Sequence, residues 1–318
     1  MTARLAARHS VFSSIPGGLI AESESGPTAR SVEPGSAVEA VGEAAAQEAS
    51  LRPVKIRARN IRKAFEVGSA GGAVPALEGV DLDIRSGEFL ALVGPSGCGK
   101  STFLDIVAGL SRADSGSLDI EGRPVQGPGL DRGVVFQGYA LFPWRTVLEN
   151  VEFGLEAQGL PKGRRREIAR EHIRLVGLEA FEERHPHQLS GGMRQRVAIA
   201  RALAHDPEIL LMDEPFGALD AQTRERLQLE MLKIKQKTAK TVLFVTHSIE
   251  EAVLLSDRVA VMTSRPGTIK TIVDISLGGD RGSDPEFRTQ AAFVALRHRV
   301  WEALHDEVDK ALSKEYSR

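Results

Sequence analysis

The sequence contains very little cysteine, few aromatic residues and no excess of either charge. Cys98 is the only cysteine among 318 residues, so no disulfide can form within the chain, which is typical of a reducing compartment. The formal net charge is -2, which gives no basic field for nucleic acid, so no nucleic-acid partner is expected. No apolar run approaches the roughly 18 residues that span a bilayer, so any membrane role must come through a partner. The 42% of hydrophobic residues is nevertheless enough to bury one or two ordinary cores.

The first 52 residues differ in composition from the rest of the chain. They are rich in Ala, Ser, Gly and Glu, with almost no aromatic residue besides Phe12. Such a segment cannot bury enough apolar surface to offset its ordering entropy, which predicts a disordered extension. Its start carries Arg4 and Arg8 without an acidic residue until Glu22, and a transit peptide remains the alternative interpretation.

A glycine-rich segment lies between an apolar run, Phe89–Val93, and a stretch with helical spacing, Phe103–Leu110. Strand, glycine-rich loop and helix in this order are typical of a phosphate-binding P-loop, although a plain glycine-rich turn is the alternative. The candidate nucleotide-binding residues are Gly94, Pro95, Ser96, Gly97, Cys98, Gly99, Lys100, Ser101 and Thr102.

Each residue type in this loop has a chemical reason. The glycines let successive amides point inward around phosphate oxygens, and the following helix presents its positive N-terminus to the same anion. Lys100 adds a mobile charge for the outer phosphates, and Ser101 adds a hydroxyl for Mg²⁺. Cys98 lies before the helix and near Lys100, which predicts a reactive thiolate; a buried, inert thiol is the alternative.

Polar side chains end two further apolar strands. Asp213 and Glu214 follow Ile209–Met212, and two carboxylates there are costly unless they serve a cation or chemistry. Asp213 is therefore a candidate Mg²⁺ ligand through water, and Glu214 a candidate base that orients or deprotonates a water molecule. His247 follows Val242–Thr246 and could reach a terminal phosphate, whereas a lone histidine after a strand is usually structural.

Residues 146–205 have helical spacing, in three helices at about 146–158, 163–177 and 190–204. Ser190 is a natural N-cap before Gly191 and Gly192, which makes a second helix end suited to an anion. Alone it would be an ordinary capped helix, but two such ends in one chain suggest a phosphate held from both sides. The preceding loop places Tyr139, Phe142 and Trp144 close together, either as a partner surface or as the cap of a local core.

Residues 54–273 resemble the ATP-binding subunit of an ABC transporter. By position, the segment 94–102 matches the Walker A motif, Gln137 the Q-loop, and 189–193 the signature motif. Residues 210–214 match the Walker B motif, 218–220 the D-loop, and His247 the switch histidine. Phe65 stands where the family places an aromatic residue that stacks on adenine; without the resemblance it would be read as a core residue.

The resemblance implies a fold of the α/β class, a P-loop NTPase of ABC type. It has a mixed central sheet, an antiparallel β subdomain and an inserted helical subdomain at about 138–205. The expected divisions are a disordered extension over 1–52, an ATP-binding domain over 53–275 and a C-terminal helical tail over 276–318. Alternating residues in Val54–Arg57 and Val80–Ile84 independently predict antiparallel strands with one wet face.

The resemblance also implies the function, an ATPase with ATP and Mg²⁺ that powers a membrane importer. The implied catalytic residues are Glu214, His247, Gln137 and Lys100, and the implied metal ligands are Ser101, Gln137 and Asp213. The implied partners are a second copy of the chain on ATP binding, integral membrane permease subunits and, indirectly, a solute-binding protein. The implied location is the cytoplasmic face of the inner membrane, as a peripheral subunit.

The segments 141–144, 187–193 and 264–267 are similar to the nitrate, sulfonate and taurine importer branch. A P-loop kinase or GTPase would leave the segment 189–193 and His247 without a role. A non-transport ABC ATPase of DNA maintenance or translation would share every motif. However, the chromosome type carries long coiled coils between Walker A and the signature, whereas only about 90 residues separate the two motifs here. The translation type normally carries two cassettes, whereas this sequence shows one set of motifs.

Overall fold

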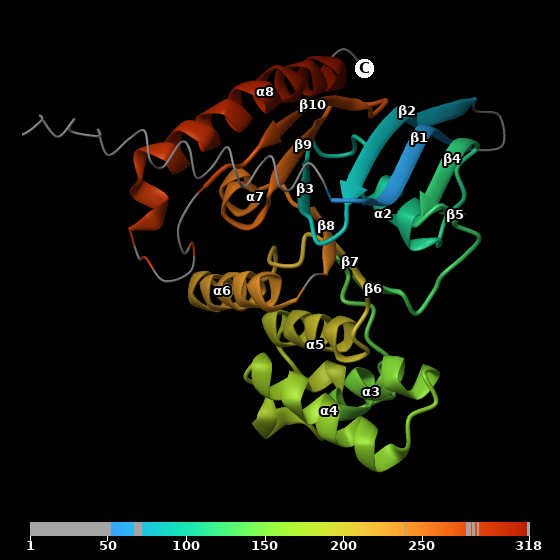
Figure 1. The fold of residues 1–318 in the computed structure, drawn as a ribbon, viewed down its shortest axis with the longest axis vertical. Coiled ribbons are helices and arrows are strands. Elements are labelled where there is room, and N and C mark those ends of the chain that lie inside the picture. The colour runs from blue at the N-terminus through green and yellow to red at the C-terminus, as the bar shows by residue number, and fades with distance from the viewer. Residues whose placement is uncertain are drawn as a thin grey trace, which may run out of the picture.

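The computed structural model describes residues 52–66, 72–238, 240–277, 281, 284 and 286–316 (Figure 1). The strands are β1 (Val54–Glu66), β2 (Ala73–Arg85), β3 (Phe89–Val93), β4 (Ser115–Ile120), β5 (Arg123–Pro124), β6 (Arg132–Val135), β7 (Ile209–Asp213), β8 (Thr241–Val245), β9 (Arg258–Met262) and β10 (Ile269–Asp274). The α-helices are α2 (Lys100–Ala108), α3 (Val147–Ala157), α4 (Lys162–Leu175), α5 (Gly191–Ala204), α6 (Ala221–Lys237), α7 (Ile249–Leu255) and α8 (Ala291–Tyr316). Short 3-10 turns are η1 (Glu179–Phe181), η2 (Pro186–Gln188) and η3 (Phe287–Thr289).

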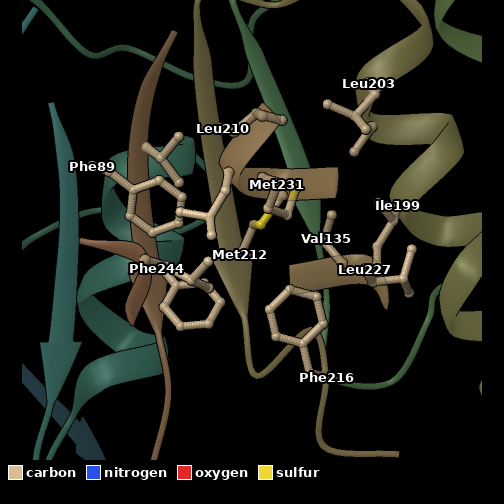
Figure 2. Packing of buried hydrophobic residues seen from close by; sticks show 14 of the residues in the cluster. Phe89, Val135, Ile199, Leu203, Leu210, Met212, Phe216, Leu227, Met231 and Phe244 are labelled. Carbon is tan, nitrogen blue, oxygen red and sulfur yellow. The ribbon is translucent and has the colours of Figure 1, made fainter. Parts of the chain in front are cut away.

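The central sheet has the strand order β10-β9-β3-β8-β7-β6, in which only β10 runs antiparallel to its neighbour. The strands β3, β7 and β8 are buried on both faces, as their unbroken apolar runs predict. Because successive side chains point to opposite faces, Phe89 and Phe244 enter one core, whereas Leu90 and Leu243 enter the other. Figure 2 shows the first core, to which these phenylalanines and side chains of α5 and α6 all belong.

The second sheet is antiparallel, with the order β2-β1-β4-β5, and it packs with α2 against the other face of the central sheet. The predicted strands at 54–57 and 80–84 are parts of the longer β1 and β2. Residues 67–71, between β1 and β2, lie outside the described residues, and so does the extension predicted over 1–52 except for Arg52. The two sheets together confirm the predicted fold class.

Three helices, α3, α4 and α5, gather at one end of the molecule, below the sheet in Figure 1. The first begins with a capping box, in which the Glu149 amide donates to Thr146 Oγ1 over 3.2 Å and the Thr146 amide donates to Glu149 Oε2 over 2.9 Å. The observed bounds differ from the predicted ones by at most two residues. This group of helices is the segment for which an inserted helical subdomain was expected.

The C-terminal helix α8 lies along the opposite end of the molecule, beside β9, β10 and α7 (Figure 1). Its Phe293 and Val300 are fully buried, seven residues apart, which is two turns of a helix face. Across the described part of the chain, no helix is long and apolar enough to cross a membrane.

Candidate functional site

The glycine-rich loop connects β3 to α2 and is fixed against β2. Gly99 is the N-cap of α2 and has a φ of 106°, a conformation that favours glycine. A Cβ atom at Gly99 would lie 2.6 Å from Leu77 Cδ2 and 2.9 Å from the Ala76 carbonyl oxygen. Because β2 approaches so closely, only glycine fits at position 99. The N-terminus of α2, with its first amides, therefore begins directly at this loop.

Lys100 points into this loop. Its Nζ donates hydrogen bonds of 2.9 Å to the carbonyl oxygens of both Gly94 and Pro95, and the side chain is buried. Both acceptors are neutral, so they do not cancel the positive charge of the ammonium group. A cation at this loop is what the sequence predicts for binding the outer phosphates.

Cys98 does not have the environment expected of a reactive thiolate. The side chain is 1% exposed, and burial raises the pKa of the thiol, although Lys100 Nζ lies 3.9 Å from Sγ and opposes the shift. The sequence-based expectation of a reactive thiolate is therefore wrong, and the inert alternative holds. The reason is desolvation, which disfavours the charged form more than the neighbouring cation favours it.

We expect alkylation of Cys98 in the folded protein to be at least tenfold slower than that of glutathione at the same pH, because both access and the thiolate fraction are reduced. The rate should rise with pH, since the raised pKa leaves little thiolate near neutrality. Mass spectrometry of the intact chain measures the rate, and the urea-unfolded chain is the control for intrinsic reactivity. Labelling as fast as that of glutathione would contradict the burial of this residue.

Asp213 and Ser101 form the candidate Mg²⁺ site. Burial raises the pKa of Asp213, a hydrogen bond with Ser101 lowers it, and the charges of Glu214 and Asp105 raise it again. Serine hydroxyl and carboxylate oxygens are the ligands that Mg²⁺ prefers, and a cation would offset the cost of this buried carboxylate. No cluster of three His, Cys, Asp or Glu side chains suited to a metal ion occurs among the described residues. Together with phosphate and water oxygens, these residues and the Gln137 carbonyl oxygen would fit a magnesium ion.

The carboxylate of Glu214 contacts two side chains, one after each of the strands that flank β7. Gln137 Nε2 donates to Glu214 Oε2 over 3.1 Å, and His247 Nδ1 lies 3.3 Å from the same oxygen. These three residues follow β6, β7 and β8, which lie side by side in the sheet (Figure 1). Because parallel strands end at one edge of a sheet, the three side chains meet there. Glu214 has a φ of 47°, an uncommon conformation for a residue other than glycine, and its amide donates to the Val245 carbonyl oxygen over 2.9 Å.

The backbone at His247 is fixed by a polar network that the sequence did not reveal. Thr246 Oγ1 accepts from the Ser248 amide over 3.0 Å and donates to Glu251 Oε2 over 2.7 Å. Gln228 Nε2 of α6 donates to the other oxygen of Glu251 over 3.3 Å. The pattern Ser-x-x-Glu at 248–251 signals a helix cap, but nothing in the sequence indicates the bond between Thr246 and Glu251.

Ser190 is the N-cap of α5, and Gly191 and Gly192 are the first two residues of this helix. Ser190 is exposed and caps the helix by accepting from the Met193 amide over 3.3 Å. No hydrogen bond or ion pair joins these three residues to the P-loop within the described part of the chain, and Figure 1 places α5 and α2 on different sides of the central sheet. One chain therefore does not bring its two anion-ready helix ends together.

Arg201 of α5 holds the loop that follows Gln137. Its guanidinium donates to the carbonyl oxygens of Ala140 over 2.6 Å and Tyr139 over 3.0 Å, and burial lowers its pKa to about 10. Both acceptor residues have positive φ angles, 47° and 63°. In the sequence, Arg201 occupies a position of the helix where apolar residues recur. This was the available signal for a structural role, because arginines are rarely buried without hydrogen-bond partners.

The aromatic residues near the site are not equally exposed. Trp144 is 71% exposed and Phe65 is 45% exposed, whereas Tyr139 and Phe142 are partly buried. Leu141, from the same loop, packs against the main core. The core-cap interpretation therefore holds for Leu141, whereas the partner-surface interpretation stays a prediction for the exposed Trp144. Lys63 Nζ lies 5.7 Å from the centroid of the Phe65 ring. Nearly half of the surface of Phe65 remains exposed to solvent.

Comparisons with known proteins agree with these motifs. The sequence profile of the ABC transporter family matches residues 77–217. An uncharacterised ABC transporter ATP-binding protein of Methanocaldococcus jannaschii is 57% identical over 259 residues, which cover 81% of this chain and 94% of the relative. The nitrate import ATP-binding protein of Synechocystis is 51% identical, covering 69% of this chain and 82% of that protein. The taurine import ATP-binding protein of Escherichia coli is 46% identical, covering 72% and 91%.

A solved structure supports the same assignment. A dimeric ATP-binding cassette in a post-hydrolysis state, bound to ADP and phosphate, superposes with a TM-score of 0.64 at 35% identity, covering 71% of this chain and all of that one. The identity with the relatives above, over most of their length, is far higher than a shared fold requires. The chain belongs to the ABC transporter ATP-binding family, and it is an ATPase of that family.

Proposed function

We propose that this chain is the ATP-hydrolysing subunit of an importer for nitrate, sulfonate, taurine or a similar small solute. The observation that carries the catalytic part is the meeting of Gln137 and His247 on one oxygen of Glu214, at the sheet edge beside the P-loop. The import part is supported by the relatives, which include nitrate and taurine import proteins. We further propose the domain division of the sequence analysis, with an extension over 1–52, the ATP-binding domain over 53–275 and the tail over 276–318.

In this proposal Glu214 is the base that orients and deprotonates the water attacking the terminal phosphate of ATP. His247 and Lys100 lie near the developing charge, where their donors stabilise it. Gln137 uses its amide nitrogen toward Glu214, which leaves its carbonyl oxygen free as a metal ligand together with Ser101 and Asp213. Magnesium would supply charge neutralisation of the phosphates.

The proposed working form is a homodimer with ATP between the subunits. Since one chain holds Ser190 apart from Lys100, a second chain would bring its own Ser190, Gly191 and Gly192 to the phosphates, and Phe65 would stack on adenine. One similar cassette was solved as a dimer in two structures. Binding of ATP and closure of the dimer would then be thermodynamically linked, because each contributes contacts that the other requires.

The proposed partner is an integral membrane permease that docks at the loop containing Trp144. Beside this loop lies an apolar hollow of about 260 Å³, lined among others by Leu130, Phe136, Phe142 and Phe153. Apolar grooves with aromatic walls receive amphipathic helices in many complexes. This docking would place the chain on the cytoplasmic face of the inner membrane and connect it indirectly with a solute-binding protein.

Transport assays test this function. The chain is co-expressed with the permease of a neighbouring reading frame and reconstituted in vesicles, and we expect ATP-dependent uptake of nitrate, sulfonate or taurine. Lys100→Ala should abolish uptake while the complex still assembles. ATP hydrolysis that responds to DNA or ribosomes, and not to the permease, would instead favour the non-transport alternative.

A further inference from the structure

The C-terminal helix α8 carries one buried carboxylate, Glu307, which is only 2% exposed. Its Oε2 accepts a hydrogen bond of 3.0 Å from the Ser264 amide. Its Oε1 lies 2.7 Å from Lys310 Nζ and 3.3 Å from Lys270 Nζ. Burial by itself would raise the pKa of Glu307, but hydrogen bonds from Lys310, Ser264 and Lys270 outweigh it and hold the pKa at about 2. The carboxylate therefore remains charged throughout the physiological pH range.

The segment that Glu307 holds is a tight turn, residues 263–268, between β9 and β10. The Thr263 amide donates to the Thr268 carbonyl oxygen over 2.9 Å, and the Thr268 amide donates to Thr263 Oγ1 over 3.0 Å. Thr263 Oγ1 also donates to the Pro266 carbonyl oxygen over 3.2 Å. The turn is thus tied together internally, so a displacement at Ser264 moves its other residues as well.

The other side of the turn rests on the P-loop. A Cβ atom at Gly267 would lie 2.0 Å from the Cys98 carbonyl oxygen, which shows how closely the two backbones approach. The Gly267 amide donates to the Ala76 carbonyl oxygen over 2.9 Å. That same oxygen lies close to Gly99, the residue that precedes Lys100. The turn and β2 together form the wall against which the P-loop is fixed.

We propose that Glu307 is a positioning residue for ATP binding, because it holds the turn 263–268 against the backbone of the P-loop at Cys98. This rests on the proposed role of residues 94–102 as the phosphate-binding loop. A buried ion pair adds little net stability over an apolar replacement, so stability alone does not explain a charge at this place. Directional hydrogen bonds fix geometry, and inward-pointing amides of a P-loop depend on geometry. The C-terminal helix thereby contributes to the nucleotide site without touching the nucleotide.

Two readouts in the full-length chain test this proposal. Cys98 is the only cysteine and lies on the braced loop, so its alkylation rate reports local opening of the P-loop. In Glu307→Ala we expect labelling at least fivefold faster, a KM for Mg-ATP at least threefold higher, and a kcat within twofold of wild type. Glu307→Gln retains an acceptor for the Ser264 amide and should give smaller changes in the same direction.

Two control variants separate positioning from general loosening. Asp309→Asn removes an exposed carboxylate from the same helix, where it pairs with His305, and should match wild type. Val300→Ala loosens the apolar packing of α8 without touching the turn. It should lower the melting temperature at least as much as Glu307→Ala while leaving the KM and the labelling rate near wild type.

The proposal is overturned if Glu307→Ala labels and binds ATP like Asp309→Asn, or if Val300→Ala reproduces both changes. Wild-type protein that fails to bind Mg-ATP would refute the phosphate-binding role of the loop and, with it, the effect on ATP binding. In that case the labelling rates would still show whether Glu307 braces the loop, so the two failures can be distinguished.

Discussion

The Glu214→Gln variant is expected to bind Mg-ATP about as tightly as wild type and to hydrolyse it more slowly by a factor on the order of 10²–10⁴, the usual contribution of a positioned base. Glutamine preserves the size of the side chain but cannot accept the proton of the attacking water. Steady-state phosphate release at saturating ATP measures the loss, and binding of a fluorescent nucleotide verifies the affinity.

Glu208→Gln is the matched control for this variant. Glu208 precedes β7, at the opposite end of the strand from Glu214, and pairs with Lys55. The same chemical change there should leave turnover within about twofold of wild type, because the carboxylate is remote from the P-loop. Unchanged turnover in Glu214→Gln would remove Glu214 from the catalytic role.

The second large effect is expected at Trp144. This side chain is 71% exposed, and its ring centroid lies 5.6 Å from that of Phe142, a residue that lines the apolar hollow. Truncating a tryptophan anchor commonly costs about 2 kcal/mol, roughly thirtyfold in affinity. Trp144→Ala should therefore weaken binding to the permease by about that factor and uncouple uptake, while the isolated subunit binds ATP normally.

Trp301 provides the control for this prediction, since it is the other tryptophan of the chain, is 45% exposed and lies on α8. Trp301→Ala should leave permease affinity unchanged. Each variant is measured twice, by affinity for the permease and by affinity for ATP. If Trp144→Ala lost nucleotide binding or folding as well, the residue would belong to the core and not to the docking surface.

The sequence was sufficient where function depends on the ends of neighbouring strands. Glu214 and His247 each follow a buried apolar run, and Gln137 follows the half-buried β6. Parallel strands end at one edge of a sheet, so the proximity of the three residues could be predicted. The P-loop was predictable for a similar reason, because its strand, glycines and helix are contiguous. Local pattern and parallel topology thus determined the cluster around Glu214.

The sequence was insufficient where a side chain depends on distant segments. Cys98 is buried because β2 and the turn at Gly267 close over the loop, and no local pattern indicates that contact. Glu251 and Glu307 look like ordinary solvated carboxylates until the fold places Thr246 and Ser264 beside them. Arg201 stood out only as a charge at an apolar helix position, without any sign of its acceptors.

The most direct test of the shared nucleotide site is the molar mass of Glu214→Gln in solution, measured by light scattering with and without Mg-ATP. The account predicts 34.4 kDa without nucleotide and twice that mass with it, because slow hydrolysis traps two chains around ATP. Adding Ser190→Arg should keep the chain at 34.4 kDa while the monomer still binds ATP through Lys100 and Ser101. A chain that stays monomeric at saturating Mg-ATP, or a dimer that is indifferent to Ser190→Arg, would contradict it.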